Sequence, residues 1–175
     1  GSDELRKEYL TPTIAGDFVA CLGVSEPGGG SDVAALKTTA KVEGGDYVIN
    51  GTKMWITNGM KADWCCLLAN TSEGAPHKNK SLIVVPMDAP GITRQKIHKI
   101  GMDSSDTAQL FFDDVRVPRR NLIGQEGLGF TFQMLQFQEE RLWGAAGSLR
   151  SMDRLIDQTI DYTRQRQAFG KSVLD

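Results

Sequence analysis

The chain has 175 residues, a formal net charge of −2 and 40% hydrophobic residues, which suits one domain with its own core, with or without an appendage. The balanced charge and the lack of a long basic run argue against nucleic acid as a partner. No apolar run reaches the roughly 18 residues that span a membrane, and no signal peptide is recognisable. We expect Gly1-Ser2 to be a cloning remnant, so the sequence constrains localisation only weakly.

Short apolar runs broken by turn signals follow a helical start. Residues 3–15 are typical of a short helix or the tail of one, which we predict to end near Pro12 because proline cannot continue a helix. Turn signals then recur as far as about Val117: Gly44-Gly45, Asn50-Gly51, Asn58-Gly59 and Pro90-Gly91. This spacing predicts a compact antiparallel β sandwich or barrel. Its strands are expected at residues 18–25, 36–43, 46–57, 63–70, 81–87, 92–98 and 107–117.

A glycine-rich loop, residues 23–32, follows the first predicted strand. Its three consecutive glycines allow backbone N–H groups to approach a ligand closely, and Ser25 and Ser31 flank them as hydroxyl donors. Two phosphate-binding motifs are excluded, because no Lys follows Gly30 as a P-loop requires, and Val33 stands where a dinucleotide fingerprint has Gly. A cradle for anionic or carbonyl oxygen and a simple solvent turn both stay open.

The cysteines indicate the redox environment. Cys21, Cys65 and Cys66 lie in apolar, strand-like runs and are odd in number, which favours reduced, buried thiols of an intracellular protein over disulfides. There is no Cys-x-x-Cys spacing, and His77 and His98 add too few ligands for a structural zinc, so we predict no metal site.

The predicted strand 46–57 closes with Trp55-Ile56-Thr57, just before a tight turn. Trp55 offers an aromatic plane and Thr57 a hydroxyl, and together they favour a planar cofactor that rests on Trp55 and is hydrogen-bonded by Thr57. Aromatic residues in strands more often serve packing, so the alternative is a half-buried Trp within the sheet.

After Pro118 the pattern predicts one long amphipathic helix that ends before Gly170. A single helix cannot bury such a stripe, so other helices, a second copy or the β domain must cover it. The chain also stops at residues 171–175 without a domain-like finish, and we expect it to be a fragment of a larger protein. The apolar stripe recurs every seven residues at Leu128, Leu135, Leu142, Leu149 and Ile156.

Glu140 shares one face of this helix with Gly144 and Gly147. Each glycine costs about 1 kcal/mol inside a helix, so a closely approaching ligand is one reason for their presence. A carboxylate held there among apolar groups could act as a general base. The alternative is a close helix crossing in which Glu140 pairs with Arg141 or another Arg.

Two groups of cations are candidates for binding phosphate. Arg164, Arg166 and Lys171 bracket the end of the helix, where they also complement its dipole. A small basic loop is either solvated or close to a nucleotide phosphate, and its residues are His77, Lys78 and Lys80.

Five motifs in one order resemble the acyl-CoA dehydrogenase family, and they span nearly the whole chain. They are residues 23–32, 55–59, 105–107, 112–118 and 166–171. In that family an all-α N-terminal domain, a middle β domain and a C-terminal four-helix bundle hold FAD. The resemblance implies a remnant of the N-terminal domain at residues 1–16, the middle β domain at 17–120 and the truncated start of the bundle at 121–175.

The resemblance implies FAD as the cofactor and assigns residues to it. Ser25 would hydrogen-bond the pyrimidine side of the flavin, Trp55 would flank the ring, and Thr57 would reach its N5 edge. Ser31 would lie near the pyrophosphate and the CoA arm, and Arg166 would contact the FAD of a neighbouring subunit. The other cofactor-binding candidates are Leu22, Gly23, Val24, Ile56 and Phe169.

The implied reaction is flavin-dependent α,β-dehydrogenation of an acyl-CoA to the trans-2-enoyl-CoA, as in β-oxidation of fatty acids. Glu140-Arg141-Leu142 resembles the long-chain and isovaleryl type, in which a Glu here takes the α proton while hydride leaves Cβ for flavin N5. Most members instead use a Glu beyond residue 175. The expected substrate contacts are Ser31, His77, Lys78, Thr131, Gln138, Glu139 and Arg141.

Partners and rival functions follow from the same resemblance. It implies electron-transfer flavoprotein as acceptor, a homodimer or homotetramer, and a mitochondrial matrix or bacterial cytoplasmic location. An acyl-CoA oxidase and a non-catalytic β-domain binding or scaffold module remain alternatives. As a fragment, the chain is expected to bind FAD poorly, to be inactive, and to dimerise or aggregate through residues 128–160. Acyl length and branching are not readable, because missing helices form much of the pocket.

Overall fold

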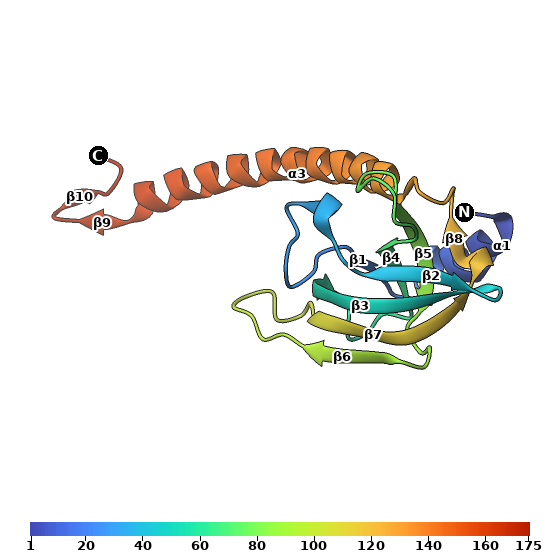
Figure 1. The fold of residues 1–175 in the computed structure, drawn as a ribbon. Helices are drawn as coiled ribbons and strands as arrows, with labels where there is room; N and C mark the ends of the chain where they lie inside the picture. Colours follow the sequence, from blue (N-terminus) through green and yellow to red (C-terminus); the bar gives the residue numbers. More distant parts are fainter. The chain divides into compact units, whose positions relative to one another are not determined.

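The computed structural model describes residues 1–175, which form two compact units, Gly1–Phe132 and Gln133–Asp175 (Figure 1). The first unit contains the β-sheet, and the second contains most of a long helix. None of the helices has both the length and the apolar character needed to cross a membrane. The domain boundaries after residues 16 and 120 stay a prediction, and the division in the structure falls between residues 132 and 133.

All seven predicted strands are present, with ends displaced by at most three residues, and the large sheet gains one further short strand, β8. The agreement reflects the turn signals, since the Gly44-Gly45 pair closes the hairpin in which Glu43 faces Asp46. The strands are β1 (Ala20–Gly23), β2 (Thr39–Glu43), β3 (Asp46–Thr57), β4 (Trp64–Asn70), β5 (Lys80–Pro86), β6 (Ile92–Lys96), β7 (Thr107–Pro118) and β8 (Leu122–Ile123).

The strands form one sheet in the order β6-β7-β3-β2-β4-β5-β8, and β1 pairs with β4 beside this path. The mainly β architecture is therefore confirmed. Purely antiparallel pairing is wrong for β1, which runs parallel to β4 with Cys21 opposite Cys65, and β2 also meets β4 in parallel at Thr39 and Asn70. The β2–β3 hairpin separates β1 from β4, and so long a connection permits parallel pairing.

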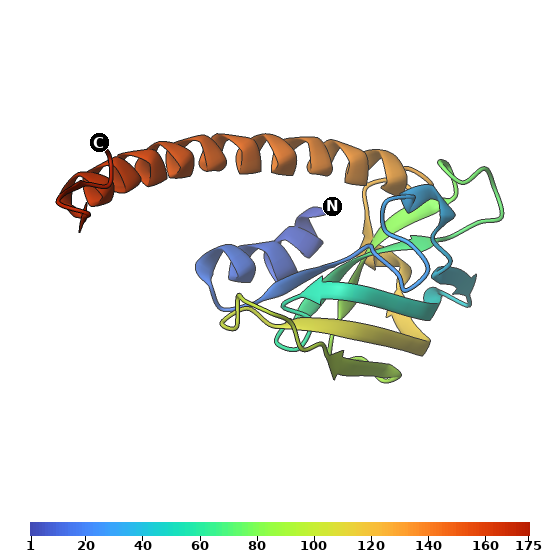
Figure 2. The ribbon, with the colours of Figure 1, turned by 90° about the vertical axis from the view of Figure 1, so that its left-hand side faces the viewer.

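Side chains from two layers of this curved sheet meet in one core. In Figure 1, β2, β3, β7 and β6 lie side by side in front of β4 and β5, and Figure 2 gives the view turned by 90°. The front strands contribute Ile49 and Val115 to the core, and the rear strands contribute Leu67 and Ile83, all fully buried. This burial of alternate apolar residues is the main source of stability for the β unit.

The N-terminal helical segment runs from Asp3 to Ala15, as α1 (Asp3–Leu5), the wide π turn η1 (Arg6–Leu10) and α2 (Thr11–Ala15). The prediction that it ends near Pro12 is wrong. Pro12 lies in the first turn of α2, where a missing N–H is tolerated, and Gly16 in a left-handed conformation (φ 88°) ends the helix.

This segment is fastened to the sheet by contacts that are far apart in sequence. Tyr9 packs edge-on against Trp64, with ring centroids 5.9 Å apart, and the Trp64 indole N–H donates to the Thr13 hydroxyl at 2.9 Å. Glu8 accepts a hydrogen bond from the Arg120 guanidinium at 2.7 Å, which lowers the pKa of Glu8.

The long helix α3 (Gly129–Gln165) has the predicted type and extent. The apolar residues of its stripe are exposed in this chain, from Leu135 through Leu142 and Leu149 to Ile156. After it, β9 (Gln167–Ala168) and β10 (Lys171–Ser172) form a small hairpin. Two short 3-10 turns complete the chain, η2 (Val33–Ala35) and η3 (Arg119–Asn121).

Candidate functional site

The glycine-rich loop is an ordered structure that its own side chains hold in place. β1 ends at Gly23, and a tight turn follows in which Glu26 and Gly29 exchange two backbone hydrogen bonds, of 2.8 and 3.0 Å. Asp32 then accepts hydrogen bonds from the N–H groups of Ala34 and Ala35 and so starts η2. The loop is therefore internally hydrogen-bonded, and its role as a cradle for a ligand stays a prediction.

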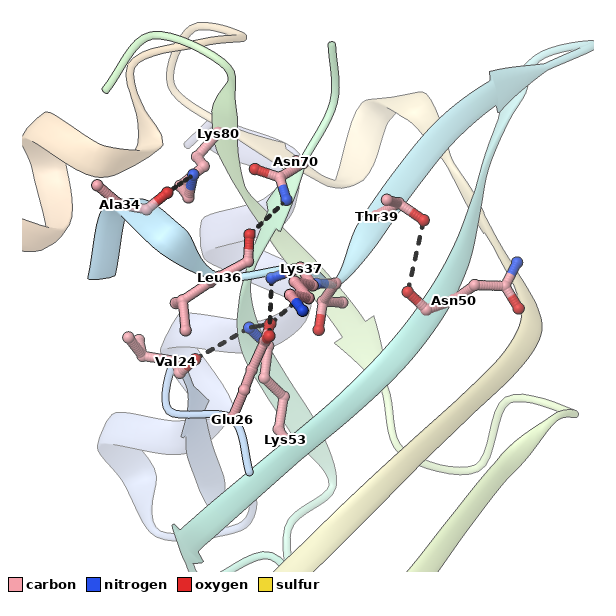
Figure 3. A network of polar contacts seen from close by, with 11 residues as sticks. Val24, Glu26, Ala34, Leu36, Lys37, Thr39, Asn50, Lys53, Asn70 and Lys80 are labelled. Atoms are coloured by element: carbon pink, nitrogen blue, oxygen red, sulfur yellow. Dashed lines mark hydrogen bonds and ion pairs between the residues drawn. The ribbon is translucent and has the colours of Figure 1, made fainter. Parts of the chain in front are cut away.

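A buried ion pair lies beneath this loop (Figure 3). The Lys53 ammonium is 3.0 Å from Glu26 Oε1 and also donates to the Val24 carbonyl at 3.0 Å. The Glu26 carboxylate accepts two further hydrogen bonds, from the N–H groups of Lys37 at 2.7 Å and Thr38 at 2.9 Å.

Burial and pairing oppose each other in setting the charges of this pair. Burial by itself would raise the pKa of Glu26, but the Lys53 charge and the hydrogen bonds outweigh it and lower that pKa. Burial lowers the pKa of Lys53, and the Glu26 charge only partly offsets this effect. The negative charge of Glu26 is thus neutralised inside the protein.

The loop is joined directly to the end of β3. The Met54 N–H donates to the Ser25 carbonyl at 2.8 Å, so the segment around Ser25 lies next to the segment that carries Trp55 and Thr57. A Cβ on Gly30 would lie 3.0 Å from the Ser25 hydroxyl oxygen, which places that hydroxyl against the glycine turn. These two segments bring together most of the cofactor-binding residues that the sequence predicts.

Trp55 has an unusual backbone and an exposed side chain. Its φ is +64°, a left-handed conformation that is strained for a bulky residue, at a bulge where the β3–β7 register shifts between Lys53 and Ile56. Trp55 is 61% exposed, and Thr57 is also exposed, whereas Ile56 between them is buried. The alternative of a half-buried packing Trp is therefore wrong, and strain of this kind is concentrated at functional sites.

The basic loop divides into one buried and two exposed residues. Lys80 is buried and donates to the carbonyls of Ala34 at 2.7 Å and Pro76 at 3.0 Å, so it is neither solvated nor free to bind phosphate, contrary to expectation. His77 and Lys78 are exposed.

The exposed part of this loop lies against the first turn of α3. The His77 ring is 4.7 Å from that of Phe130, and Thr131, another predicted substrate contact, is the next residue of the same turn and is exposed. A Cβ on Gly127 would lie only 2.8 Å from the Lys78 carbonyl, so the close approach needs a glycine here. The predicted substrate contacts His77, Lys78 and Thr131 thus form one group.

Glu140 belongs to the helical unit. Its carboxylate accepts a hydrogen bond from the Gln136 amide at 3.1 Å, and Gln136 in turn accepts one from Gln133 at 2.7 Å. Arg141 extends over the Phe137 ring, 5.4 Å from its centroid, and does not pair with Glu140 in this chain; the alternative of a helix crossing with another Arg stays a prediction.

The surface of α3 around Glu140 is open. Gln138, Glu139 and Arg141 are exposed, as is Glu140 itself. A Cβ added at Gly144 or Gly147 would meet no atom within 4 Å, so these glycines make no close contact within this chain. They line a shallow groove together with Trp143, Ser148, Ser151, Met152 and Leu155.

The hairpin after α3 presents two further predicted residues. Phe169 is fully exposed and has a left-handed φ of +53°, and Gly170 beside it has φ +81°, as a two-residue hairpin turn requires. Arg166, directly before β9, is also exposed.

The sequence alone did not single out Glu26 and Lys53. The available signals were a Lys between apolar residues of a strand and a Glu next to Pro in a glycine loop. Both residue types are usually exposed, so their burial against each other could not be read from composition.

Both parts of the chain resemble known proteins. Residues 21–115 match the acyl-CoA dehydrogenase middle domain, and residues 127–175 match the acyl-CoA dehydrogenase C-terminal domain. The mitochondrial short-chain specific acyl-CoA dehydrogenase of Rattus norvegicus is 39% identical over 171 residues, covering 97% of this chain and 42% of that protein. The mitochondrial long-chain specific enzyme of Sus scrofa is 38% identical over 176 residues, covering 99% and 41%.

Solved structures give the same result. A probable acyl CoA dehydrogenase from Mycobacterium abscessus superimposes with a TM-score of 0.94 at 43% identity, covering 99% of this chain and 46% of that one. A glutaryl-CoA dehydrogenase from Mycobacterium smegmatis in complex with FADH2 gives a TM-score of 0.89 at 36% identity, covering 99% and 44%. The chain therefore spans less than half the length of these proteins. Its nearly equal identity to the short-chain and long-chain enzymes does not favour the long-chain type.

Proposed function

The chain belongs to the acyl-CoA dehydrogenase family, whose members bind FAD, and we propose that the full-length protein oxidises an acyl-CoA to its trans-2-enoyl-CoA. The observation that carries this proposal is the junction of Ser25 and Trp55 through the 2.8 Å bond from Met54 N–H to the Ser25 carbonyl. It sets a hydroxyl-bearing loop beside an exposed aromatic plane, and both lie in the part matched to the middle domain.

The residues of this surface fit a flavin. Trp55 offers an exposed ring face, Ser25 and Thr57 offer neutral hydroxyl donors, and Lys53 neutralises the carboxylate of Glu26 beneath the loop. FAD, when bound, is the oxidant that accepts the hydride from Cβ of the acyl group. We assign the remaining cofactor contacts to Leu22, Gly23, Val24, Ser31, Ile56, Arg166 and Phe169, of which Arg166 would serve the FAD of a neighbouring subunit.

We assign the removal of the α proton to Glu140. Gln136 donates to one carboxylate oxygen, Oε2, which orients the group and leaves Oε1 as the proton acceptor. A Glu beyond residue 175 is the competing position for this base. We assign the binding of the acyl-CoA to exposed cations and polar groups of the glycine-rich loop, the basic loop and helix α3. They are Ser31, His77, Lys78, Thr131, Gln138, Glu139 and Arg141.

The test is purification of the full-length protein followed by flavin and turnover assays. We expect bound FAD, and enoyl-CoA formation with at least one member of a panel from isovaleryl-CoA to palmitoyl-CoA when electron-transfer flavoprotein is the acceptor. Hydrogen peroxide formed in step with enoyl-CoA in air would make the protein an oxidase. Failure of the protein to take up FAD would contradict the proposal and favour a non-catalytic binding module.

A further inference from the structure

One buried ion pair connects three segments of the candidate flavin surface. Lys53 on β3 reaches the Val24 carbonyl, just before the glycine loop, and Glu26 within the loop. Glu26 reaches the N–H groups of Lys37 and Thr38, just after the loop. Figure 3 shows the Lys53 ammonium between the Val24 carbonyl and the Glu26 carboxylate, which also meets the Lys37 N–H.

Burial in this form favours a geometric role over a purely stabilising one. The side chains of Lys53 and Glu26 are 0% and 8% exposed, and moving two charges out of water cancels much of what their attraction contributes. The contribution of the pair is directional, since the ammonium and the carboxylate make their four contacts, one with each other and three with backbone groups, only if the loop takes one position.

The residues held by this pair are those assigned to the flavin. Ser25 stands between Val24 and Glu26, and Trp55 stands two residues after Lys53, on the bulge. A hydrogen bond from the Met54 N–H to the Ser25 carbonyl also joins these two segments. A shift of Glu26 relative to Lys53 therefore moves Ser25 relative to Trp55.

We propose that Glu26 and Lys53 are a positioning pair that fixes the Ser25 loop against the Trp55 strand end and thereby sets the affinity and environment of the flavin. The inference rests on the proposed function of this surface. Neither side chain contacts the cofactor, because both are enclosed beneath the loop. They act through Ser25 and Trp55.

The experiment uses the full-length protein with Lys53→Met, Glu26→Gln and the double variant. The readouts are the dissociation constant of FAD for the apoprotein, the absorbance spectrum of bound flavin, and amide hydrogen exchange of residues 24–38 and 53–57. Each single variant is expected to weaken FAD binding by about tenfold or more and to shift the spectrum. Exchange in the two segments should rise by more than exchange in β5, which follows only the global loss of stability. If a single variant does not fold, the double variant, which leaves no unpaired charge, supplies the measurement.

Two controls separate positioning from general stability. Asn121→Ala removes a buried amide that donates to the Val84 carbonyl away from the loop, and it should lower stability without changing FAD affinity. The pair formed by Glu43 and Arg116 is also 3.0 Å long but exposed, and its loss should change neither readout.

Each outcome decides between the proposals. FAD affinity and exchange that match the parent, or that change only as far as in Asn121→Ala, would overturn the positioning role. A parent protein that binds no FAD would instead contradict the proposed function. In that case exchange of the two segments still decides whether the pair holds them together.

Discussion

The Glu26 carboxylate lies 3.0 Å from the Lys53 ammonium, with the lysine side chain fully excluded from solvent. Removing one partner leaves the other as an unpaired buried charge, so we expect Lys53→Met to lower the free energy of unfolding by about 3–5 kcal/mol. The double variant Glu26→Gln/Lys53→Met should lose less than Lys53→Met alone. Urea unfolding measures both, and equal losses in the two variants would contradict the pairing.

Acid should lower the free energy of unfolding by protonating Glu26 of the same pair. The pKa of Glu26 is lowered in the folded state, so its stabilisation is fully present above its unfolded pKa, about 4.3, and is lost as pH falls through the folded pKa. We expect the free energy of unfolding to fall below about pH 5 and to fall less steeply in Glu26→Gln. Parallel pH curves for parent and variant would count against this assignment.

The left-handed backbone of Trp55 should lower the stability of the folded protein. Its φ of +64° is unfavourable for any residue with a Cβ, and its side chain is largely exposed, so little packing is lost when it is removed. Trp55→Gly should therefore be more stable than Trp55→Ala by roughly 1 kcal/mol. Both variants should lose FAD affinity in the full-length protein, and a Trp55→Ala variant with unchanged affinity would remove Trp55 from the flavin site.

Glu140 is the residue whose role is easiest to disprove. In the full-length protein we expect Glu140→Gln to lower turnover by about 10²–10⁴-fold or more, because the amide keeps the size of the side chain but cannot accept the α proton. FAD content should be unchanged, which separates chemistry from folding. Asp157→Asn, which removes an exposed carboxylate on the same helix that has no assigned role, is the control. Turnover near that of the parent would move the base beyond residue 175.

The thiols should be inert in the folded protein. Burial raises the pKa of Cys66 to about 12, and contact with Cys21 together with burial raises that of Cys65. Only the thiolate reacts readily, so a disulfide reagent at pH 8 should label neither residue until the chain unfolds. Since these folded-state pKa values exceed those of the unfolded thiols, both groups should also lower stability as pH rises above about 8.5. Rapid native labelling of Cys66 would contradict this picture.

The strands were predictable because local rules and the fold agree. Pairs such as Gly44-Gly45 mark hairpins whatever lies around them, and alternating apolar residues make one face of a strand buried. The parallel β1 was not predictable, because its partner β4 begins more than forty residues later and nothing local selects it. The helix end near Pro12 was predicted wrongly for a related reason. A proline in the first turn of a helix and a proline that ends a helix give the same local sequence signal.

The site was predictable in part for the same reason. The segments around Ser25 and Trp55 carry recognisable residues, but their junction depends on the 2.8 Å bond from Met54 to Ser25, which no spacing encodes. The exposure of Trp55 follows from a backbone outlier that sequence patterns do not reveal. Lysines are usually exposed, so a sequence pattern does not predict the burial of Lys53 and Lys80.

The attachment of the N-terminal helix bears on the order of folding during synthesis. The partner of Glu8, Arg120, lies 112 residues later in the chain. At roughly 5–20 residues per second, translation of the intervening residues takes on the order of 6–20 seconds. Trp64, which donates a hydrogen bond to Thr13, lies 51 residues after it. The helical segment 3–15 is thus made well before the residues that secure it, and until they are made its apolar face at Leu5 and Tyr9 stays uncovered.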